Sequence, residues 1–398
     1  MKDINVTTES TAKVSVIVPT FNRSMFIGET LDSIEPQLRL ADEIIVVDDG
    51  STDSTSALMK SGAWPIRYLR QENAGKSVAV EYGIREASGD LIWIVDDDDI
   101  MANGALEAMR KPLESDIEAG FTFGSYNYLI KKNNAWVQQP TPVFDRPSEP
   151  LHLSLLRRCF FFQSGMLVRK SCYETVGSFD ITLRRSQDYD MILRLSRLFK
   201  GVEVVGPLFH QRQHDGQRGA NEAAIAAHNR DIAWMRYDGQ IFDRIYKTYP
   251  LEEFEDLVKH RDYIDKYDLE IAARIVRATV MARRALWSHA AEDIRSIASI
   301  MNLNSNIRLS IDQLRDLSTI FSWAGYGLLG ADQANTLIEA LACFPRKERI
   351  RAMRSLFRPL PGRLKNAIRN KDYKLTMNAI KIMSQLGPQL INLGMIKD

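Results

Sequence analysis

Short apolar runs rich in β-branched residues alternate with segments of helical periodicity through the N-terminal third of this 398-residue chain. Uninterrupted apolar runs of this kind are typical of strands that are buried on both faces of a sheet. The strand-like runs are Val14–Val18, Glu43–Val47, Ile66–Leu69 and Leu91–Val95, and the helical segments are residues 24–34, 51–59, 77–87 and 104–113. This order predicts an α/β fold, with a mainly parallel sheet and helices on both faces.

The pattern becomes less regular after this region and then changes to helix. Residues 121–137 have the pattern of a strand pair, 140–150 of a proline-rich loop, 160–168 of another strand and 188–198 of a helix. From about Ala220 helical spacing dominates, most clearly over residues 254–286 and 312–342. We therefore predict an α/β domain at residues 1–219 and an all-helical region at residues 220–398.

Polar side chains follow three of the predicted strands, at the point where each strand ends. The three groups are Pro19-Thr20-Phe21-Asn22, Asp48-Asp49-Gly50-Ser51 and Asp96 to Asp99. Ligands of open α/β sheets bind beyond the carboxyl ends of the strands, so these groups are expected to meet in one site. A lone D-x-D is more often a solvated acidic turn. At the end of a buried strand, however, its carboxylates offer the hard oxygen ligands that suit Mg²⁺ or Mn²⁺.

The charge balance and the cysteines narrow the class of protein. The chain has 52 Lys and Arg against 51 Asp and Glu, and this formal net charge of +1 argues against a dedicated nucleic-acid binder. Its three scattered cysteines form no CxxC pair, as expected for free thiols in a reducing compartment. No stretch approaches the roughly 20 apolar residues of a membrane-spanning helix. We expect a cytoplasmic protein, with or without a peripheral contact at the inner membrane surface.

Six motifs in a fixed order carry a resemblance to a known family. They are Val14-Ser15-Val16-Ile17-Val18-Pro19-Thr20-Phe21-Asn22-Arg23, Ile45-Val46-Val47-Asp48-Asp49-Gly50-Ser51-Thr52-Asp53, Glu72-Asn73-Ala74-Gly75-Lys76, Trp93-Ile94-Val95-Asp96-Asp97-Asp98-Asp99, Val176-Gly177-Ser178-Phe179-Asp180 and Gln187-Asp188-Tyr189-Asp190. Together they resemble the family 2 glycosyltransferases of the GT-A (Rossmann-like) fold, over about residues 13–217. The resemblance implies metal-dependent transfer of a sugar, with inversion, from a nucleotide diphosphate donor to an acceptor hydroxyl.

The resemblance also implies roles for individual residues. Asp188 is the implied general base that takes the acceptor proton, and Asp98 and His214 are the implied ligands of Mn²⁺ or Mg²⁺. The donor nucleotide is implied to contact Pro19, Thr20, Phe21, Asn22, Asp49, Asn73, Lys76, Asp96 and Asp97. Within this set Asp49 would bond to the base, Phe21 would pack on it and Asp97 would contact the ribose. Asp96 is expected to support the site indirectly, and Asp99 to be only structural.

Some assignments leave alternatives open. Asp188 could instead be an ordinary first-turn acid that the helix dipole favours. Asp190 competes with it for the role of base. His214 could be structural, because a lone histidine often is. The neighbouring Arg212 is a candidate contact for the donor phosphates.

The chain departs from the family pattern at two places. Ala79-Val80-Glu81 lacks the Arg and Asn that relatives often carry there, which leaves Lys76 as the basic donor contact from that helix. Gln187 stands where the family often has Glu, next to the expected base. This difference could alter the acceptor or the pKa of the base.

The expected activity is a glycosyltransferase that uses a UDP-sugar, although the pocket motifs do not separate UDP from GDP or dTDP. The acceptor could be a glycan, a lipid-linked sugar or a protein. One alternative is a nucleotidyltransferase that makes nucleotide sugars, but residues 19–23 lack its Gly-rich basic loop. Another is a non-catalytic scaffold that binds a nucleotide sugar, which the retained Asp49, Asp98 and Asp188 argue against.

The helical region has two further features without an assigned role. Residues 346–374 are rich in Lys and Arg with interleaved apolar residues, and they predict either a basic amphipathic surface that meets anionic lipid or an ordinary solvated helix face. Pro359 and Pro361 interrupt any long helix there. Residues 375–395 are apolar and could pack against a second subunit. Acceptor binding, membrane contact and homo-oligomerisation therefore stay open for this region.

Overall fold

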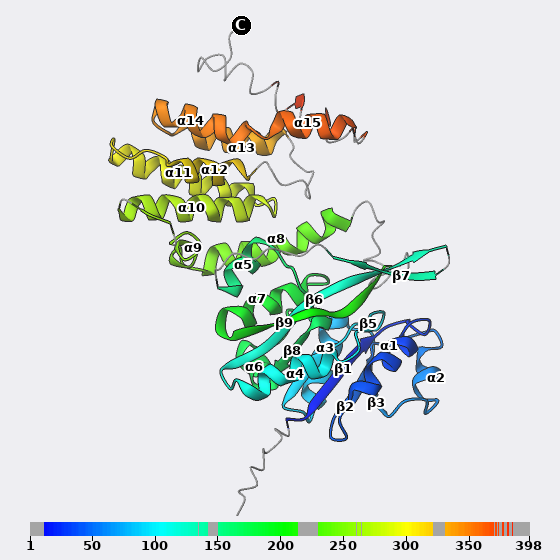
Figure 1. Ribbon diagram of the computed structural model, residues 1–398. Coiled ribbons are helices and arrows are strands. Elements are labelled where there is room, and N and C mark those ends of the chain that lie inside the picture. The colour runs from blue at the N-terminus through cyan, green and yellow to red at the C-terminus, as the bar shows by residue number, and fades with distance from the viewer. Residues whose placement is uncertain are drawn as a thin grey trace, which may run out of the picture. The chain divides into compact units, whose positions relative to one another are not determined.

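The computed structural model describes residues 12–133, 135–141, 150–213, 230–259, 261–263, 265–320 and 331–369, together with single residues between 371 and 384. The chain divides into two compact units, Met1–Ile225 and Ala226–Asp398. Figure 1 shows the strands in the first unit and helices in the second. The predicted boundary between residues 219 and 220 lies outside the described residues and stays a prediction.

The sheet is built on four parallel strands, β1 (Val14–Thr20), β2 (Glu43–Asp48), β3 (Ile66–Arg70) and β4 (Leu91–Ile94). They lie in the order β3-β2-β1-β4, so the first strand of the chain is central. Every residue of β1 and β4 is buried, as the uninterrupted apolar runs predict. Thr20 pairs with Asp48, which brings the carboxyl ends of β1 and β2 to the same edge.

Beyond β4 the sheet becomes mixed. β8 (Met166–Arg169) runs antiparallel to β4, followed by β6 (Ala119–Lys132), β9 (Lys200–Gln213) and β5 (Ile100–Met101). β7 (Ala135–Pro140) pairs antiparallel with the outer half of β6, so the predicted strand pair is present. The predicted strand over residues 160–168 is wrong in its first part, because Gln163–Gly165 form a 3-10 turn, η2. The Trp93 indole holds this turn by donating to the Ser164 carbonyl at 2.9 Å.

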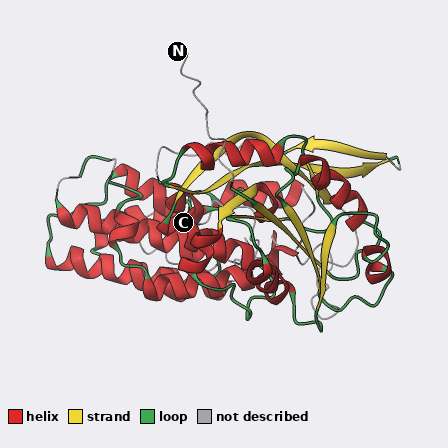
Figure 2. Ribbon diagram, turned by 90° about the horizontal axis from the view of Figure 1, so that it is seen from below, coloured by secondary structure: helices red, strands yellow, loops and turns green. Residues whose placement is uncertain are grey.

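Helices cover both faces of the parallel strands, in agreement with the predicted fold class. The described helices of the first unit are α1 (Ile27–Ile34), α2 (Thr55–Met59), α3 (Lys76–Glu86), α4 (Ala105–Ser115), α5 (Leu151–Arg157), α6 (Lys170–Val176) and α7 (Gln187–Leu198), with a short η1 (Glu35–Gln37). On one face of β1, Val14, Val16 and Val18 join one core with α1 and α4. On the other face, Ile17 packs against α3. Figure 2, coloured by secondary structure, shows helices packed beside the strands.

The described part of the second unit contains α8 (Arg230–Thr248), α9 (Glu252–Glu255), α10 (Lys266–Ala282), α11 (Trp287–Leu303), α12 (Ile311–Ser318), α13 (Ala331–Ala342), α14 (Arg346–Phe357) and α15 (Leu360–Arg369). The helical prediction over residues 254–286 is wrong in its extent, because α10 starts only at Lys266. Asp265 caps this helix by accepting from the amides of Tyr267 and Asp268. Similarly, the prediction over residues 312–342 falls on two helices, and residues 321–330 between them lie outside the described residues. Among the described residues, no helix is both long enough and apolar enough to cross a bilayer.

Gly83 provides a test of the close packing between α3 and β1. A Cβ at this position would clash with Cγ2 of Ile17, a fully buried branched side chain. Gly83→Ala should therefore lower the free energy of unfolding by about 1–3 kcal/mol, measured by urea denaturation. Gly28→Ala in α1 is the matched control, because its Cβ would lie 3.4 Å from Trp64. Equal stability of the two variants would contradict this account of the packing.

Candidate active site

Asn22 joins the loops that follow β1 and β2. Its backbone is in the left-handed region with φ of 54°, which asparagine tolerates better than most residues. Its amide N–H donates to Ser51 Oγ at 2.9 Å, and its side-chain oxygen accepts from the Thr52 amide at 2.7 Å. Asn22 is a predicted contact of the sugar donor, but its side-chain oxygen is already bonded within the protein, where it holds the two loops together.

Asp49, which directly follows β2, holds the turn that leads into α3. Its buried carboxylate accepts from Gln71 Nε2 at 2.7 Å and from the backbone amides of Ala74 and Gly75, both at 2.8 Å. Asn73 also bonds to this residue, through its side-chain nitrogen and the Asp49 carbonyl at 2.9 Å. Asp49, predicted to bond to the nucleotide base, thus fixes the shape of the loop around the predicted base site.

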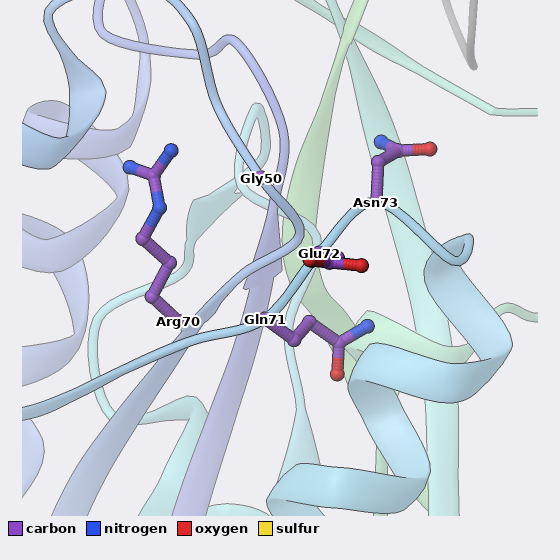
Figure 3. A pocket seen from close by; sticks show the side chains of 5 residues that line it. All are labelled: Gly50, Arg70, Gln71, Glu72 and Asn73. Carbon is purple, nitrogen blue, oxygen red and sulfur yellow. The ribbon is translucent and has the colours of Figure 1, made fainter.

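A pocket of about 480 Å³ opens at this edge of the sheet, beside Asp49. It is lined by Gly50, Arg70, Gln71, Glu72 and Asn73. Figure 3 shows the Arg70, Gln71 and Asn73 side chains leaving the backbone in different directions near the turn at Gly50. Gly50 has φ of 81°, and a Cβ there would lie 2.9 Å from the backbone nitrogen of Asn73. The position thus requires glycine for the loops after β2 and β3 to approach each other.

Three carboxylates of the aspartate run come together after β4. Asp96, Asp98 and Asp99 each offer an oxygen atom that lies within 4.8 Å of the others. Asp98 and Asp99 are 8% and 2% exposed. Carboxylate oxygens are the hard ligands that suit Mg²⁺ and Mn²⁺, which complete their coordination with water or substrate oxygens. Asp99, expected to be only structural, has its carboxylate in this cluster, where it also accepts from Ser164 and from the Arg212 backbone amide, so the expectation stays a prediction.

Ser164 and Arg212 hold the cluster in place from distant parts of the chain. Ser164 Oγ lies 3.1 Å from Asp99 Oδ2 and accepts from the Asp96 amide at 3.2 Å. Arg212 donates through Nε to the Asp98 carbonyl at 3.0 Å and pairs with Glu29 at 2.8 Å. The Arg212 guanidinium is 1% exposed and also packs against aromatic rings. Arg212 is a predicted phosphate contact, but its guanidinium is buried and bonded to the Asp98 carbonyl and to Glu29.

Asp97 is not one of the three clustered carboxylates, and its side chain faces Arg23. The shortest distance between the Arg23 guanidinium and the Asp97 carboxylate is 3.5 Å. Burial and the neighbouring Asp98 raise the pKa of Asp97 to about 7, although Arg23 opposes this shift. Arg23 also lies 3.9 Å from Asp98, so it is a positive group at the edge of the carboxylates that the sequence prediction missed.

Lys76 links the cluster to Asp188. Its ammonium lies 2.5 Å from Asp96 Oδ1. Burial works against the charge of Lys76, but Asp96, Asp188 and Asp98 outweigh it and raise the pKa of Lys76. For Asp188, burial raises the pKa above the usual carboxyl range, Lys76 opposes the shift and Asp96 adds to it. The structure thus brings the expected base and the expected donor residues into one electrostatic group.

Asp190 differs from Asp188 although both lie in the first turn of α7. Asp190 is 1% exposed and pairs with Arg194 at 3.0 Å. Arg194 in turn donates to the carbonyls of Val176 and Ser178, at 2.8 and 3.0 Å. This network ties α7 to the end of α6, which gives Asp190 a structural role and weakens its claim to be the base.

Two buried glutamines flank the site. Gln163 is 6% exposed, and neither atom of its amide has a hydrogen-bond partner among the described residues. Gln187, 9% exposed, likewise has an unpaired side-chain oxygen there. Gln163 precedes Ser164 and Gln187 precedes Asp188, which places both beside functional candidates. Buried amides without partners are rare, so these two are candidate contacts for a ligand.

The remaining predicted site residues lie at or just after the end of β1, except for His214. Pro19 and Thr20 are the last two residues of this strand and are buried. The Thr20 carbonyl accepts from the Asp49 amide at 2.8 Å. Phe21 follows and is half-buried. His214, predicted as a metal ligand, lies outside the described residues.

Comparison with known proteins shows what this part of the chain is similar to. Residues 15–177 match the model of Glycosyl transferase family 2. The structure is similar to S. aureus TarS 1-349 in complex with UDP-GlcNAc, with a TM-score of 0.51 and 15% identity over 94% of this chain and 92% of that chain. This likeness shows a shared fold. Residues 15–177 are thus similar to the family 2 glycosyltransferases, and the N-terminal unit has a fold of the GT-A type.

Two bacterial relatives each match about half of this chain. An uncharacterized glycosyltransferase of Rickettsia bellii is 29% identical over 227 residues, which are 55% of this chain and 32% of that protein. Uncharacterized glycosyltransferase RT0329 of Rickettsia typhi is 28% identical over 209 residues, 51% of this chain and 65% of that protein. The matched region is thus less than two thirds of either relative.

A pair of matched substitutions separates the roles of the two acids in α7. Asp190→Asn should lower the free energy of unfolding by about 2 kcal/mol, because it removes the charge that pairs with Arg194. Asp188→Asn should leave stability unchanged or raise it, because burial already disfavours the Asp188 charge. Urea denaturation of both variants measures this. A larger loss for Asp188→Asn than for Asp190→Asn would contradict these roles.

Proposed function

We propose that this protein transfers a single sugar, with inversion, from a nucleotide diphosphate sugar to an acceptor hydroxyl. The observation that carries the proposal is the meeting of the Asp96, Asp98 and Asp99 carboxylates with Lys76 and Asp188 at the carboxyl edge of the parallel strands. The family 2 match over residues 15–177 supports the reaction class. The product would enter the synthesis of a glycan or glycoconjugate.

A divalent cation, Mn²⁺ or Mg²⁺, completes this proposal. Asp98 is its proposed principal ligand, together with Asp96 and Asp99, and His214 remains a proposed further ligand. Their oxygen atoms are hard ligands within 4.8 Å of one another, which supports the fit. When bound, such a cation supplies positive charge that stabilises a diphosphate leaving group. Lys76 adds a fixed positive charge on the same side, since its pKa is raised.

The donor nucleotide is proposed to bind across the ends of β1, β2 and β3. Pro19, Thr20 and Phe21 end one side of this region, and Asp49 and Asn73 shape the other. The pocket beside Gly50 is open there and supports the placement. Asp97 remains the proposed ribose contact, and Asn22 acts by holding the loops together. We favour a UDP-sugar, which is the donor bound in the TarS structure.

Asp188 is proposed as the general base. It lies in the first turn of α7, and its raised pKa places its proton affinity above that of an ordinary carboxyl group. A base of this kind takes the proton from the acceptor hydroxyl as the sugar bond forms. Gln163 and Gln187 are proposed to bind hydroxyl groups of the sugar or the acceptor, since their amides have atoms left unpaired by the described residues.

Calorimetry with a panel of UDP-, GDP- and dTDP-sugars tests the donor proposal. Donor binding should require Mn²⁺ or Mg²⁺, and Asp98→Asn should weaken metal-dependent binding about 100-fold because a ligand is lost. Asp116→Asn is the control, since this acid pairs with Lys200 on the surface. The enzyme proposal fails if no nucleotide sugar binds with either metal. The metal assignment fails if Asp98→Asn binds like the parent protein.

Transfer assays with the best donor test the base. Asp188→Asn should keep donor binding and lose about 10²- to 10⁴-fold in turnover, because proton abstraction is lost. Full activity of this variant would show that another group is the base.

The pH dependence of transfer gives a second readout of Asp188. The base must be ionised, so turnover should fall as the pH drops through its raised pKa, above the range of an ordinary carboxyl group. Lys76 favours the ionised form of Asp188, so Lys76→Met should move this acid limb to higher pH at saturating donor. An acid limb that stays in place, or moves to lower pH, would contradict the coupling of these two residues.

A further inference from the structure

The helical unit contains a basic cleft that the proposed reaction does not use. It has a volume of about 400 Å³ and lies between α12 and α14. Its lining residues are Ile311, Leu314, Arg315, Ser318, Arg351, Arg354, Ser355 and Arg358. Four of these eight residues are arginines and none is acidic. The cleft, defined by these residues, is called the arginine cleft below.

Helical spacing explains why these side chains share one cleft. Ile311, Leu314, Arg315 and Ser318 recur at three- and four-residue intervals and form one face of α12. Arg351, Arg354 and Arg358 do the same on α14 and into its C-terminal end. A capping box of Ser310 and Gln313 fixes the start of α12, and Ser355 Oγ donates to the Leu314 carbonyl between the helices.

The acids near the cleft neutralise only part of its charge. Arg315 pairs with Asp312 one turn earlier at 2.8 Å, and Arg351 pairs with the buried Glu348 at 2.8 Å. Arg354 and Arg358 are exposed, and within the described part of the chain neither side chain pairs with an acid. Two guanidinium groups that line the same concave surface therefore keep their full charge toward solvent.

Guanidinium groups that line one cleft favour planar or tetrahedral oxyanions as ligands. An arginine side chain can donate two parallel hydrogen bonds to a phosphate, and it is desolvated at lower cost than an ammonium group. Like charges that face one cleft repel one another, so a phosphate between them relieves this repulsion. Ile311 is 75% exposed at the cleft, which adds an apolar contact beside the charged groups.

We propose that the arginine cleft is a binding site for phosphate or phosphodiester groups, separate from the donor site of the N-terminal unit. The ligand could be a soluble molecule that bears several phosphates or the headgroup of an anionic lipid, since both present the same oxyanion. The first source would place a phosphate-bearing molecule on the helical unit, and the second would place this unit on a membrane surface.

The test uses the full chain and two probes, soluble tripolyphosphate followed by calorimetry and phosphatidylglycerol vesicles followed by flotation. Arg354→Ala with Arg358→Ala should weaken binding roughly tenfold to thirtyfold, because two charges near the phosphates are lost. Arg295→Ala with Lys347→Ala is the control, since it removes the same charge from exposed positions that do not line the cleft. Thermal unfolding of both variants checks that the fold is kept.

The outcomes separate the sources of the phosphate. Binding of tripolyphosphate without vesicle flotation supports a soluble ligand, and flotation without tripolyphosphate binding supports a lipid headgroup. In either case the cleft variant should lose binding while the control keeps it, and added salt should weaken the binding. Failure of the parent protein to bind either probe overturns the proposal, as does an equal loss in both variants. Donor binding at the N-terminal unit is unaffected in each case.

Discussion

The parallel pairing of β1 with β2 on one side and β4 on the other is the constraint on which the site depends. Thr20 pairs with Asp48, and the Val95 amide donates to the Ile17 carbonyl at 3.0 Å. This register brings the ends of the three strands to one edge, where polar residues can leave the buried sheet. A shift of register would move the loops of the candidate site apart.

Hydrogen bonds within the protein then fix the loops at that edge. Asn22 joins the first two loops, and Asp49 bonds to the turn before α3. Ser164 and Arg212 do the same for the aspartate run. A site that is shaped before its ligand arrives loses less entropy on binding and holds reacting groups in position.

Charge is the second physical feature of the site. Several buried carboxylates lie close together, and burial raises the pKa of Asp97 and of Asp188. Lys76 and Arg23 place positive charge among these carboxylates and so reduce the electrostatic repulsion between them. A group of acids that is only partly compensated attracts cations, which is consistent with the proposed cation and with the proposed role of Asp188 as a base. The arginine cleft has the opposite charge and a separate proposed ligand.

The sequence by itself determined the order and type of the first strands and helices, since apolar runs and helical spacing depend on neighbouring residues. It also located the aspartate run and Asp188. Only the tertiary structure decided which carboxylates meet, because Asp99 is held by Ser164 and Arg212, which lie 65 and 113 positions away. The turn at Gln163, which interrupts a predicted strand, depends likewise on a bond from Trp93. Side-chain direction beyond a strand end follows no sequence period, and long-range contacts set it.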